Sequence, residues 1–468
     1  MYNADVMSII NNKNKESDSI SSAQIIPLGF LALILLGAFL LLLPISTAKG
    51  FHTDLLTALF TSTTSTCVTG LVVVDTFNHW SRFGKIVILI LIQLGGLGVI
   101  AVSSTVMLLL HMKLSLSKRL LIMDAFNLNS LNGLVKFLTK VVKGTLLIEL
   151  FGAILYSIRF IPRFGLGYGI WISVFTSVSA FCNAGIDVIG PDSLISFNSD
   201  PLVLAVTSFL IIMGGLGYVV WFDMLAVARK TNVGKGGLKY FFKRLNEHTK
   251  LVLSITLFLL VSGTIFVYLL ECENPSTIGN MSFGDQIMNC FFQSVSFRTA
   301  GFASIPQQGL KDSTALMGCF YMFIGGSPVG TAGGVKTVTV FMVLLNAVAF
   351  IRNRDENVIF NRNVPDRIVD KAVAIVTVSF MITFVFTTLL MTTGNISLTD
   401  AIYEVTSATA TVGLSRGLTP NLTEFGKIII IICMYLGRIG PISMAIFFSA
   451  RKPSKNDIGY ADGKYLVG

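Results

Sequence analysis

Charged residues are scarce in this sequence: Asp, Glu, Lys and Arg make up only 13% of its 468 residues. Soluble proteins carry about 25%. The low share, together with 53% hydrophobic residues and a mean hydropathy of +0.74, excludes an ordinary water-soluble protein. We therefore expect lipid to be the main solvent of this chain.

Motifs for metal binding and catalysis are also missing. The six cysteines form no C-x-x-C pair, and the four histidines are dispersed, so neither a zinc site nor a disulfide framework is expected. A membrane enzyme would need a nucleophile with a base, or a metal set, and no H-E-x-x-H or G-x-S-x-G occurs. We predict a protein that is not an enzyme and has no cofactor. The polar N-terminus also lacks the pattern of a cleaved signal peptide.

Long apolar runs are abundant. Crossing the bilayer core takes about 20 apolar residues, and the sequence predicts eight full spans, near residues 25–47, 86–110, 141–161, 202–228, 251–270, 316–349, 372–392 and 427–450. The fold class is therefore an all-α integral membrane protein.

The basic residues cluster between these spans. The N-terminus, the segments 111–140, 229–250 and 351–371, and the tail after residue 450 hold 23 of the 35 Lys and Arg residues. The positive-inside rule makes these parts cytoplasmic. We therefore predict a multi-pass protein of the cell membrane with both termini inside, and no nucleic-acid partner. The alternative is a basic patch for anionic lipid or RNA.

Between the two spans of each pair lies a shorter, Ser/Thr-rich segment that is too polar to cross the bilayer. These segments, which we expect to be re-entrant, cover residues 51–69, 168–184, 283–300 and 397–412. Each ends in a similar phrase with one glycine before a large apolar residue: Thr66-Cys-Val-Thr-Gly-Leu71, Phe181-Cys-Asn-Ala-Gly-Ile186, Phe297-Arg-Thr-Ala-Gly-Phe302 and Thr409-Ala-Thr-Val-Gly-Leu414.

The glycines of these phrases recur at a nearly constant distance, 115, 116 and 112 residues apart. A fixed period indicates repeated structural units. We predict four helix, pore-loop, helix repeats in a pseudo-fourfold arrangement around one ion pore. The division is a cytoplasmic tail at 1–24, repeats at 25–112, 113–230, 231–350 and 351–450, and a second cytoplasmic tail at 451–468.

The phrases fit an ion filter made of backbone carbonyls. A dehydrated potassium ion needs oxygens in place of water, and rings of carbonyls supply them. Glycine permits the φ > 0 conformations that turn carbonyls toward one axis, and the end of the preceding helix adds negative potential. The predicted filter residues are Val68, Thr69, Gly70, Asn183, Ala184, Gly185, Thr299, Ala300, Gly301, Thr411, Val412 and Gly413. The alternative is that these glycines only pack transmembrane turns.

The second span of each repeat carries a further glycine cluster. Gly95, Gly214, Gly325 and Gly437 begin these clusters 25, 29, 24 and 24 residues after the filter glycines. In the fourth cluster Arg438 replaces glycine, and an arginine at membrane depth is a functional candidate. We predict that Arg438 is an electrostatic barrier below the filter. The alternative is an ion pair with Glu149 or Glu404.

The third cluster opens a Gly- and Pro-rich run that cannot remain helical. A phosphate-binding loop is excluded because the spacing does not fit and no strand precedes it. We predict a gate made by Arg438 and by residues of this run, namely Gly325, Gly326, Ser327, Gly330, Thr331, Gly333, Gly334 and Lys336.

The four pore loops with one filter glycine each resemble the Trk/Ktr/HKT superfamily of potassium transporters. The closing stretch Tyr460-Ala-Asp-Gly-Lys-Tyr-Leu-Val-Gly468 is similar to the tail of Ktr-type membrane subunits. The resemblance implies sodium-dependent potassium uptake, sodium acting as an activator, by a homodimer on a ring of cytosolic nucleotide-binding regulatory subunits. It also implies an intramembrane loop that obstructs the pore. The competing functions are a sodium-preferring or non-selective HKT-like pore, which would carry serine at Gly70, and a secondary carrier, which would show two repeats instead of four.

Overall fold

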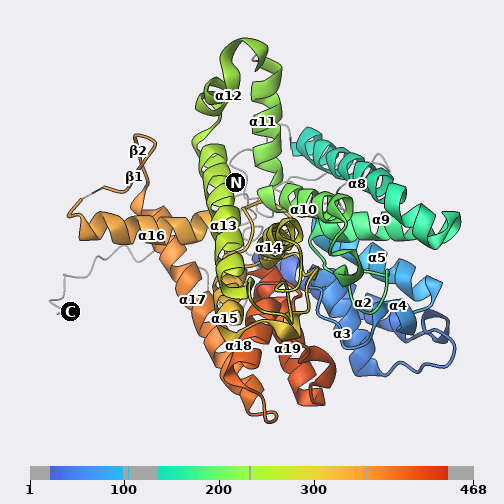
Figure 1. The fold of residues 1–468 in the computed structure, drawn as a ribbon. Helices are drawn as coiled ribbons and strands as arrows, with labels where there is room; N and C mark the ends of the chain where they lie inside the picture. The colour runs from blue at the N-terminus through green and yellow to red at the C-terminus, as the bar shows by residue number, and fades with distance from the viewer. Residues whose placement is uncertain (1–21, 99–103, 105–133, 231–232, 355, 441–468) are drawn as a thin grey trace, which may run out of the picture.

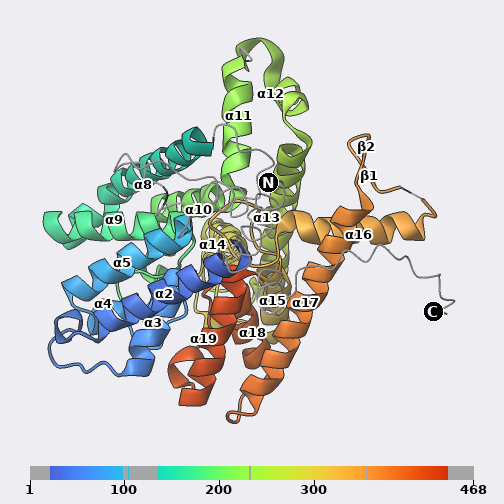
Figure 2. The same ribbon diagram turned by 180° about the vertical axis from the view of Figure 1, so that it is seen from behind.

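The computed structural model describes residues 22–98, 104, 134–230, 233–354 and 356–440, and it is mostly helical (Figures 1 and 2). Its helices are α2 (Ser22–Leu42), α3 (Leu55–Cys67), α4 (Thr76–His79), α5 (Arg82–Leu97), α8 (Leu134–Phe164), α9 (Leu166–Cys182), α10 (Pro201–Leu216), α11 (Tyr218–Lys230), α12 (Val233–Arg244), α13 (Glu247–Glu271), α14 (Phe283–Phe297), α15 (Asp312–Phe323), α16 (Thr337–Ile351), α17 (Asp366–Met391), α18 (Leu398–Thr409) and α19 (Glu424–Ile439). The tail Tyr460–Gly468, which is similar to the tail of Ktr-type subunits, lies outside the described residues.

A small β-hairpin departs from the all-α prediction. Strands β1 (Val358–Ile359) and β2 (Arg362–Asn363) pair antiparallel, with Val358 opposite Asn363. The two turn residues, Phe360 and Asn361, both have positive φ, of 48° and 62°. Two such residues make the tight turn that matches the twist of a hairpin.

The first span of each predicted repeat is a long helix. α2, α8, α13 and α17 are each long and apolar enough to cross a membrane, which confirms the four outer spans. Much of each helix faces outward: in α17 only 17% of the spanning window is buried. This exposure fits contact with lipid on the outside of the molecule.

The second spans are shorter than predicted. α5, α10, α15 and α19 have only 12 to 16 residues in the described part of the chain. α10 and α11 form a span that bends by 97° at Gly217, and the third span is interrupted between α15 and α16. The prediction of a continuous second inner span is therefore wrong, whereas the interruption of the third inner span was predicted from its Gly- and Pro-rich run. The reason is local, because Gly217 has φ +88°, which breaks a helix without steric cost. The later parts of the predicted spans 86–110 and 427–450 lie largely outside the described residues.

Each segment that we expect to be re-entrant contains a short helix, which we call a pore helix. These helices are α3, α9, α14 and α18. Polar side chains start three of them: Asp54 accepts a hydrogen bond from Thr57 N, Ser282 from Asp285 N, and Ser397 from Asp400 N. Such caps satisfy the first backbone donors of a helix. These three helices therefore begin at defined residues.

Three pore helices dock on their outer helix through the same serine and glycine contact. Ser62 Oγ donates to Ile34 O, Ser177 Oγ to Glu149 O, and Ser294 Oγ to Leu260 O. In each case a glycine three residues later on the outer helix faces that serine, at Gly37, Gly152 and Gly263. A Cβ at these glycines would collide with the serine, so the contact requires glycine. This contact fixes the position of each of these three pore helices against its outer helix.

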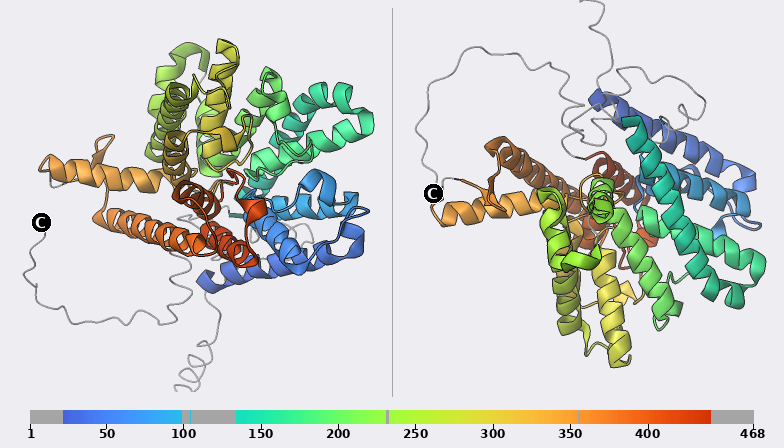
Figure 3. Two further views of the ribbon diagram at one scale, coloured as in Figure 1. Left: turned by 60° about the horizontal axis from the view of Figure 1, so that its bottom comes forward. Right: turned by 90° about the horizontal axis from the view of Figure 1, so that it is seen from above.

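The helices lie in chain order around a common centre. In the left view of Figure 3, the blue, teal-to-green, yellow and orange-to-red groups follow one another around the centre of the molecule. The hairpin of α11 and α12 projects beyond the rest of the molecule, and α16 extends sideways (Figure 1).

Candidate ion pathway

The four segments that follow the pore helices share an unusual backbone. The residue two before each glycine has positive φ, with 57° at Val68, 61° at Asn183, 64° at Thr299 and 52° at Thr411. Three of these residues are β-branched, for which this conformation is a steric outlier. The glycines themselves have φ of 97°, 63°, 78° and 98°. Strain that recurs four times indicates a backbone held for function.

The four glycines form a closed ring. A Cβ built on Gly70 would lie directly against Ala184 O, one on Gly185 would lie 2.6 Å from Ala300 O, and one on Gly301 would lie 2.5 Å from Val412 O. A Cβ on Gly413 would meet Thr69 O, which closes the circle. Each glycine thus lies beside the carbonyl that precedes the next glycine in the sequence.

The amide groups of these segments point back toward the pore helices. Gly70 N donates to Thr64 Oγ1 and Gly413 N to Ser407 Oγ, at 2.9 and 3.0 Å. Thr69, Ala184, Ala300 and Val412 likewise donate their N–H groups to carbonyls of the pore helices. These bonds leave the carbonyl side of each segment free to face another direction.

In the part of the chain that the structure describes, the carbonyls of the twelve predicted filter residues have no protein donor. Within the described residues, no N–H or O–H group donates to any of these oxygens. Ten of the twelve residues are buried, and buried carbonyls without a partner are rare in proteins. An array of such oxygens around four glycines is suited to replace the water shell of a cation.

A cavity opens at the ring of the four glycines. It is lined by Gly70, Gly185, Gly301 and Gly413, and by the carboxylates of Asp75 and Asp187. Asp187 lies in the loop after α9, outside the spanning helices, and accepts a hydrogen bond from Ile189 N. Burial raises the pKa of Asp187 to about 6, and the nearby charge of Asp75 adds to this effect.

Uptake should therefore weaken in mild acid. Protonation below pH 6 removes one negative charge from the cavity beside the ring, so cation uptake at low ion concentration should fall as pH drops from about 7 to 5. Asp187→Asn should flatten this pH profile, whereas Glu273→Gln, at an exposed carboxylate of a neighbouring loop, should preserve it. Uptake measured against pH checks this, and a variant profile that matches the wild-type profile would contradict the role of Asp187.

The inner helices reach the ring because glycines allow close approach. A Cβ at Gly95, Gly214 or Gly437 would collide with the carbonyl of the residue four before a filter glycine, namely Thr66 O, Phe181 O or Thr409 O. Three inner helices then end at a glycine with φ of 86° to 88°, at Gly98, Gly217 and Gly440. The third has Pro328 at this place, and proline cannot adopt positive φ. The chain there takes another course.

That course is the loop of residues 324–336, which corresponds to the intramembrane loop that the family resemblance implies. Ser327 N donates to Gly215 O at 2.9 Å, Thr331 N to Gly214 O at 3.1 Å, and Tyr218 N to Val329 O at 3.0 Å. Gly333 lies directly against Thr411 Oγ1. The loop therefore lies between the bend of α10 and α11 and the filter segment after α18. The eight predicted gate residues of the run all belong to it: Gly325, Gly326, Ser327, Gly330, Thr331, Gly333, Gly334 and Lys336.

Arg438 joins this loop to the first inner helix. Its Nη1 donates to Thr331 O at 2.6 Å, and its Nη2 donates to Gly95 O and, at 3.3 Å, to Gly96 O. The sequence left an ion pair with Glu149 or Glu404 open. In the described residues those carboxylates have other partners: Glu149 accepts from Gln93, and Glu404 accepts from Ser415 and Thr419. The guanidinium of Arg438 is thus bound by backbone carbonyls of the loop and of the first inner helix.

A polar cluster next to the second filter segment was not predicted from the sequence. Gln93 Nε2 donates to Glu149 at 3.2 Å, and the thiol of Cys182 donates to Gln93 at 3.7 Å. Glu149 is 5% exposed. A glutamate within a predicted span indicated a buried polar network, but no spacing rule identifies the partners of Glu149.

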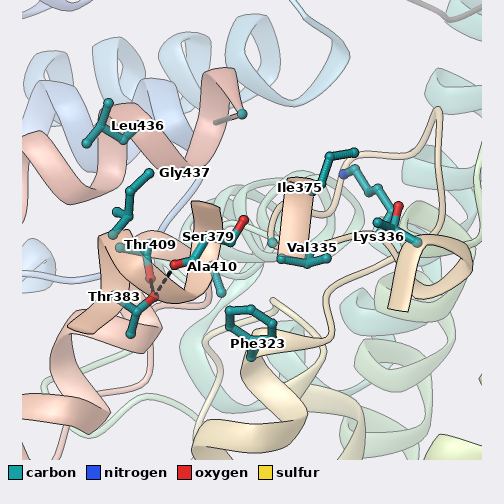
Figure 4. A pocket seen from close by; sticks show the side chains of 14 residues that line it. Phe323, Val335, Lys336, Ile375, Ser379, Thr383, Thr409, Ala410, Leu436 and Gly437 are labelled. Atoms are coloured by element: carbon teal, nitrogen blue, oxygen red, sulfur yellow. Dashed lines mark hydrogen bonds between the residues drawn. The ribbon is translucent and has the colours of Figure 1, made fainter. Parts of the chain in front are cut away.

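A lateral cavity of about 180 Å³ lies beside the loop, lined by residues of α15, α17, α18 and α19. Figure 4 shows Lys336 and Ile375 on one side of it, and the contact between Thr383 and Thr409 on the other. Lys336 Nζ donates to Ala332 O at 2.6 Å. The cavity therefore lies between the loop and α17.

Known proteins share this architecture. The TrkH family, described as cation transport protein, matches residues 8–460. "Ktr system potassium uptake protein B" from Bacillus subtilis is 38% identical over 445 residues, covering 95% of this chain and 96% of that protein. "Potassium/sodium uptake protein NtpJ" from Enterococcus hirae is 36% identical, covering 96% and 97%.

A solved structure agrees in fold. The crystal structure of the potassium transporter TrkH from Vibrio parahaemolyticus superposes with a TM-score of 0.74, at 16% identity, covering 93% of this chain and 86% of that one. With the family match over nearly the whole sequence, this chain belongs to the TrkH family of membrane cation transport proteins.

Proposed function

We propose that this chain is the potassium-translocating membrane subunit of a Ktr-type uptake system. The observation that carries the proposal is the array of carbonyls around Gly70, Gly185, Gly301 and Gly413 that accept no hydrogen bond from the described residues. Backbone carbonyls coordinate potassium without any carboxylate in the filter. The names of the relatives from Bacillus subtilis and Enterococcus hirae, both potassium uptake proteins, point to the same ion.

The proposal includes four repeats around one pore. Support comes from the equivalent helices in each unit, from the recurring serine and glycine contact in three of them, and from the order in which the filter glycines contact one another. The repeat boundaries remain 25–112, 113–230, 231–350 and 351–450, and the pseudo-fourfold axis would pass through the glycine ring.

The gate in this proposal is the intramembrane loop with Arg438. The loop contacts the filter segment at Thr411, and the guanidinium places a positive charge beside it. A positive charge near the ion path raises the energy of a passing cation. Movement of the loop would open the path, and loss of the Arg438 contacts would favour that movement.

Regulation would come from other chains. We propose a homodimer in the cell membrane with both termini cytoplasmic, docked on a cytosolic ring of nucleotide-binding regulatory subunits, with sodium as an activator. The clustering of basic residues between spans supports the orientation. The projecting hairpin of α11 and α12, which contains Arg229, Lys230, Lys243 and Arg244, offers a cationic surface on that side.

A second candidate is a pore that also passes sodium. The relative named a potassium/sodium uptake protein favours it. Gly70 argues for potassium, because sodium-preferring HKT-like pores would carry serine at that position. Rubidium and sodium uptake into liposomes that hold the purified protein, with and without a regulatory subunit, decides between them. Rubidium flux that potassium suppresses and sodium does not supports the proposal, and equal suppression supports the second candidate.

Filling the lateral cavity should slow transport. Ser379→Phe would place an aromatic ring into this space and leave the loop less room beside Lys336. We expect rubidium uptake to fall severalfold with unchanged preference for potassium over sodium. Val378→Phe is the matched control, because Val378 is 39% exposed on the outer face of α17. If Ser379→Phe transports like the control, the loop does not use this cavity.

A further inference from the structure

Thr331 is held by three different parts of the molecule. Its N–H donates to Gly214 O on the second inner helix, and its carbonyl accepts from Arg438 on the fourth. Its Oγ1 lies 3.1 Å from Phe181 O and 3.2 Å from the side-chain amide of Asn183. Asn183 belongs to the second filter segment. Thr331 thus touches both the arginine of the gate and the filter.

Only one orientation of the Asn183 side-chain amide gives both its NH₂ group and the Thr331 hydroxyl a hydrogen-bond partner. A hydroxyl has one hydrogen, so it can donate to only one of its two neighbours. With the amide oxygen facing the hydroxyl, the NH₂ group of Asn183 is a buried donor without a partner. With the amide turned over, the NH₂ group donates to Thr331 Oγ1, and the hydroxyl donates to Phe181 O. The amide oxygen of Asn183 is then free.

Two of the other filter segments also carry a side-chain oxygen without a partner among the described residues at the position equivalent to Asn183. These oxygens belong to Thr299 and Thr411, and both are buried. Free oxygens at equivalent positions of the filter segments are suited to a cation or its water molecules. The orientation of the Asn183 amide therefore bears on which ion the filter prefers.

We propose that Thr331 is a positioning residue that couples the intramembrane loop to the ion preference of the filter through Asn183. This inference rests on the proposed function of the loop as a gate. When the loop lies in place, the Thr331 hydroxyl fixes the amide of Asn183 with its oxygen toward the ion path. When the loop moves away, the amide loses this partner and turns freely, so selectivity and gating change together.

The test measures rubidium uptake in competition with potassium and sodium, in liposomes that hold the full chain. Thr331→Val keeps the shape and removes the hydroxyl, while the backbone contacts to Gly214 and Arg438 remain. We expect the preference for potassium over sodium to fall about fivefold, the factor for one net hydrogen bond of about 1 kcal/mol. Thr331→Ser should restore it. Asn183→Leu should lower it similarly, and the double variant should be no worse than either single one.

Ser327→Ala is the matched control. Its hydroxyl is buried in the same loop but faces Thr337 and not the filter. This variant is expected to change the rate without changing the ion preference. Thermal unfolding shows whether each variant is folded, and Thr331→Ala carries the same test if valine is not tolerated.

The outcomes separate the inference from the function. Wild-type selectivity in Thr331→Val and Thr331→Ala, or independent and multiplying effects in the double variant, would overturn the coupling. A wild-type protein without preference for potassium would instead overturn the proposed function itself.

Discussion

Gly70→Ser should lower the preference for potassium over sodium by at least about tenfold. The residue has φ +97°, a conformation that costs a side-chain-bearing residue about 1–2 kcal/mol. Its Cβ would also lie against Ala184 O, one of the carbonyls without a donor. The carbonyl must move away from the ion, and the ring then fits potassium less well. Gly185→Ser, Gly301→Ser and Gly413→Ser should act in the same direction, because each Cβ meets the next carbonyl of the ring.

Gly50→Ser separates crowding at the ring from backbone strain. Gly50 has φ +90°, but a Cβ there has no neighbour within 4 Å. This variant should be slightly less stable and keep the wild-type ion preference. Competition of sodium with rubidium uptake measures the effect, and size-exclusion chromatography confirms folding. Wild-type selectivity in all four ring variants would show that the glycines do not form the filter.

Arg438→Ala should raise the rate of potassium uptake about tenfold or more. The change removes a positive charge, whose interaction with a cation is on the order of 4 kcal/mol at 4 Å and an effective dielectric near 20. It also removes the bond to Thr331 O that holds the loop. Arg438→Lys should be intermediate, because one ammonium group does not reproduce the planar fork that reaches Thr331 O and Gly95 O together. Ion preference should change far less than rate.

A surface arginine provides the control for this prediction. Arg159 is half exposed and pairs with Asp200 at 3.2 Å, so Arg159→Ala should leave uptake near the wild-type rate. Initial rates of rubidium uptake and thermal unfolding are measured for both variants. A well-folded Arg438→Ala protein with no gain in rate would show that Arg438 is not a brake.

The sequence predicted the features that repeat. The constant spacing of the filter glycines indicated four equivalent segments, and the structure brings Gly70, Gly185, Gly301 and Gly413 together. Periodicity works here because each segment needs the same φ > 0 geometry, which glycine supplies. The pore helices and the interruption of the third inner span followed from the same kind of local signal. The roles of these residues in selection and gating stay predictions.

The features that depend on a single partner could not be predicted. Sequence showed that Arg438 needs a partner but not which one, because backbone carbonyls such as Thr331 O carry no sequence signal. The 97° bend at Gly217 was missed for a related reason. The hydropathy of α10 and α11 is continuous, but hydropathy does not show that the helix axis changes direction between them. The sequence shows the serine and the glycine, but only the fold shows that Ser62 and Gly37 are in contact.

The most direct test of the central claim is to locate the ion. We predict that crystals of the full chain grown with rubidium or thallium will show anomalous scattering peaks on the axis enclosed by Gly70, Gly185, Gly301 and Gly413, among the carbonyls to which no described residue donates a hydrogen bond. Potassium should displace these peaks and sodium should not. A ring that stays empty at saturating rubidium, or peaks that sodium displaces as readily as potassium, would contradict the claim that this ring selects potassium.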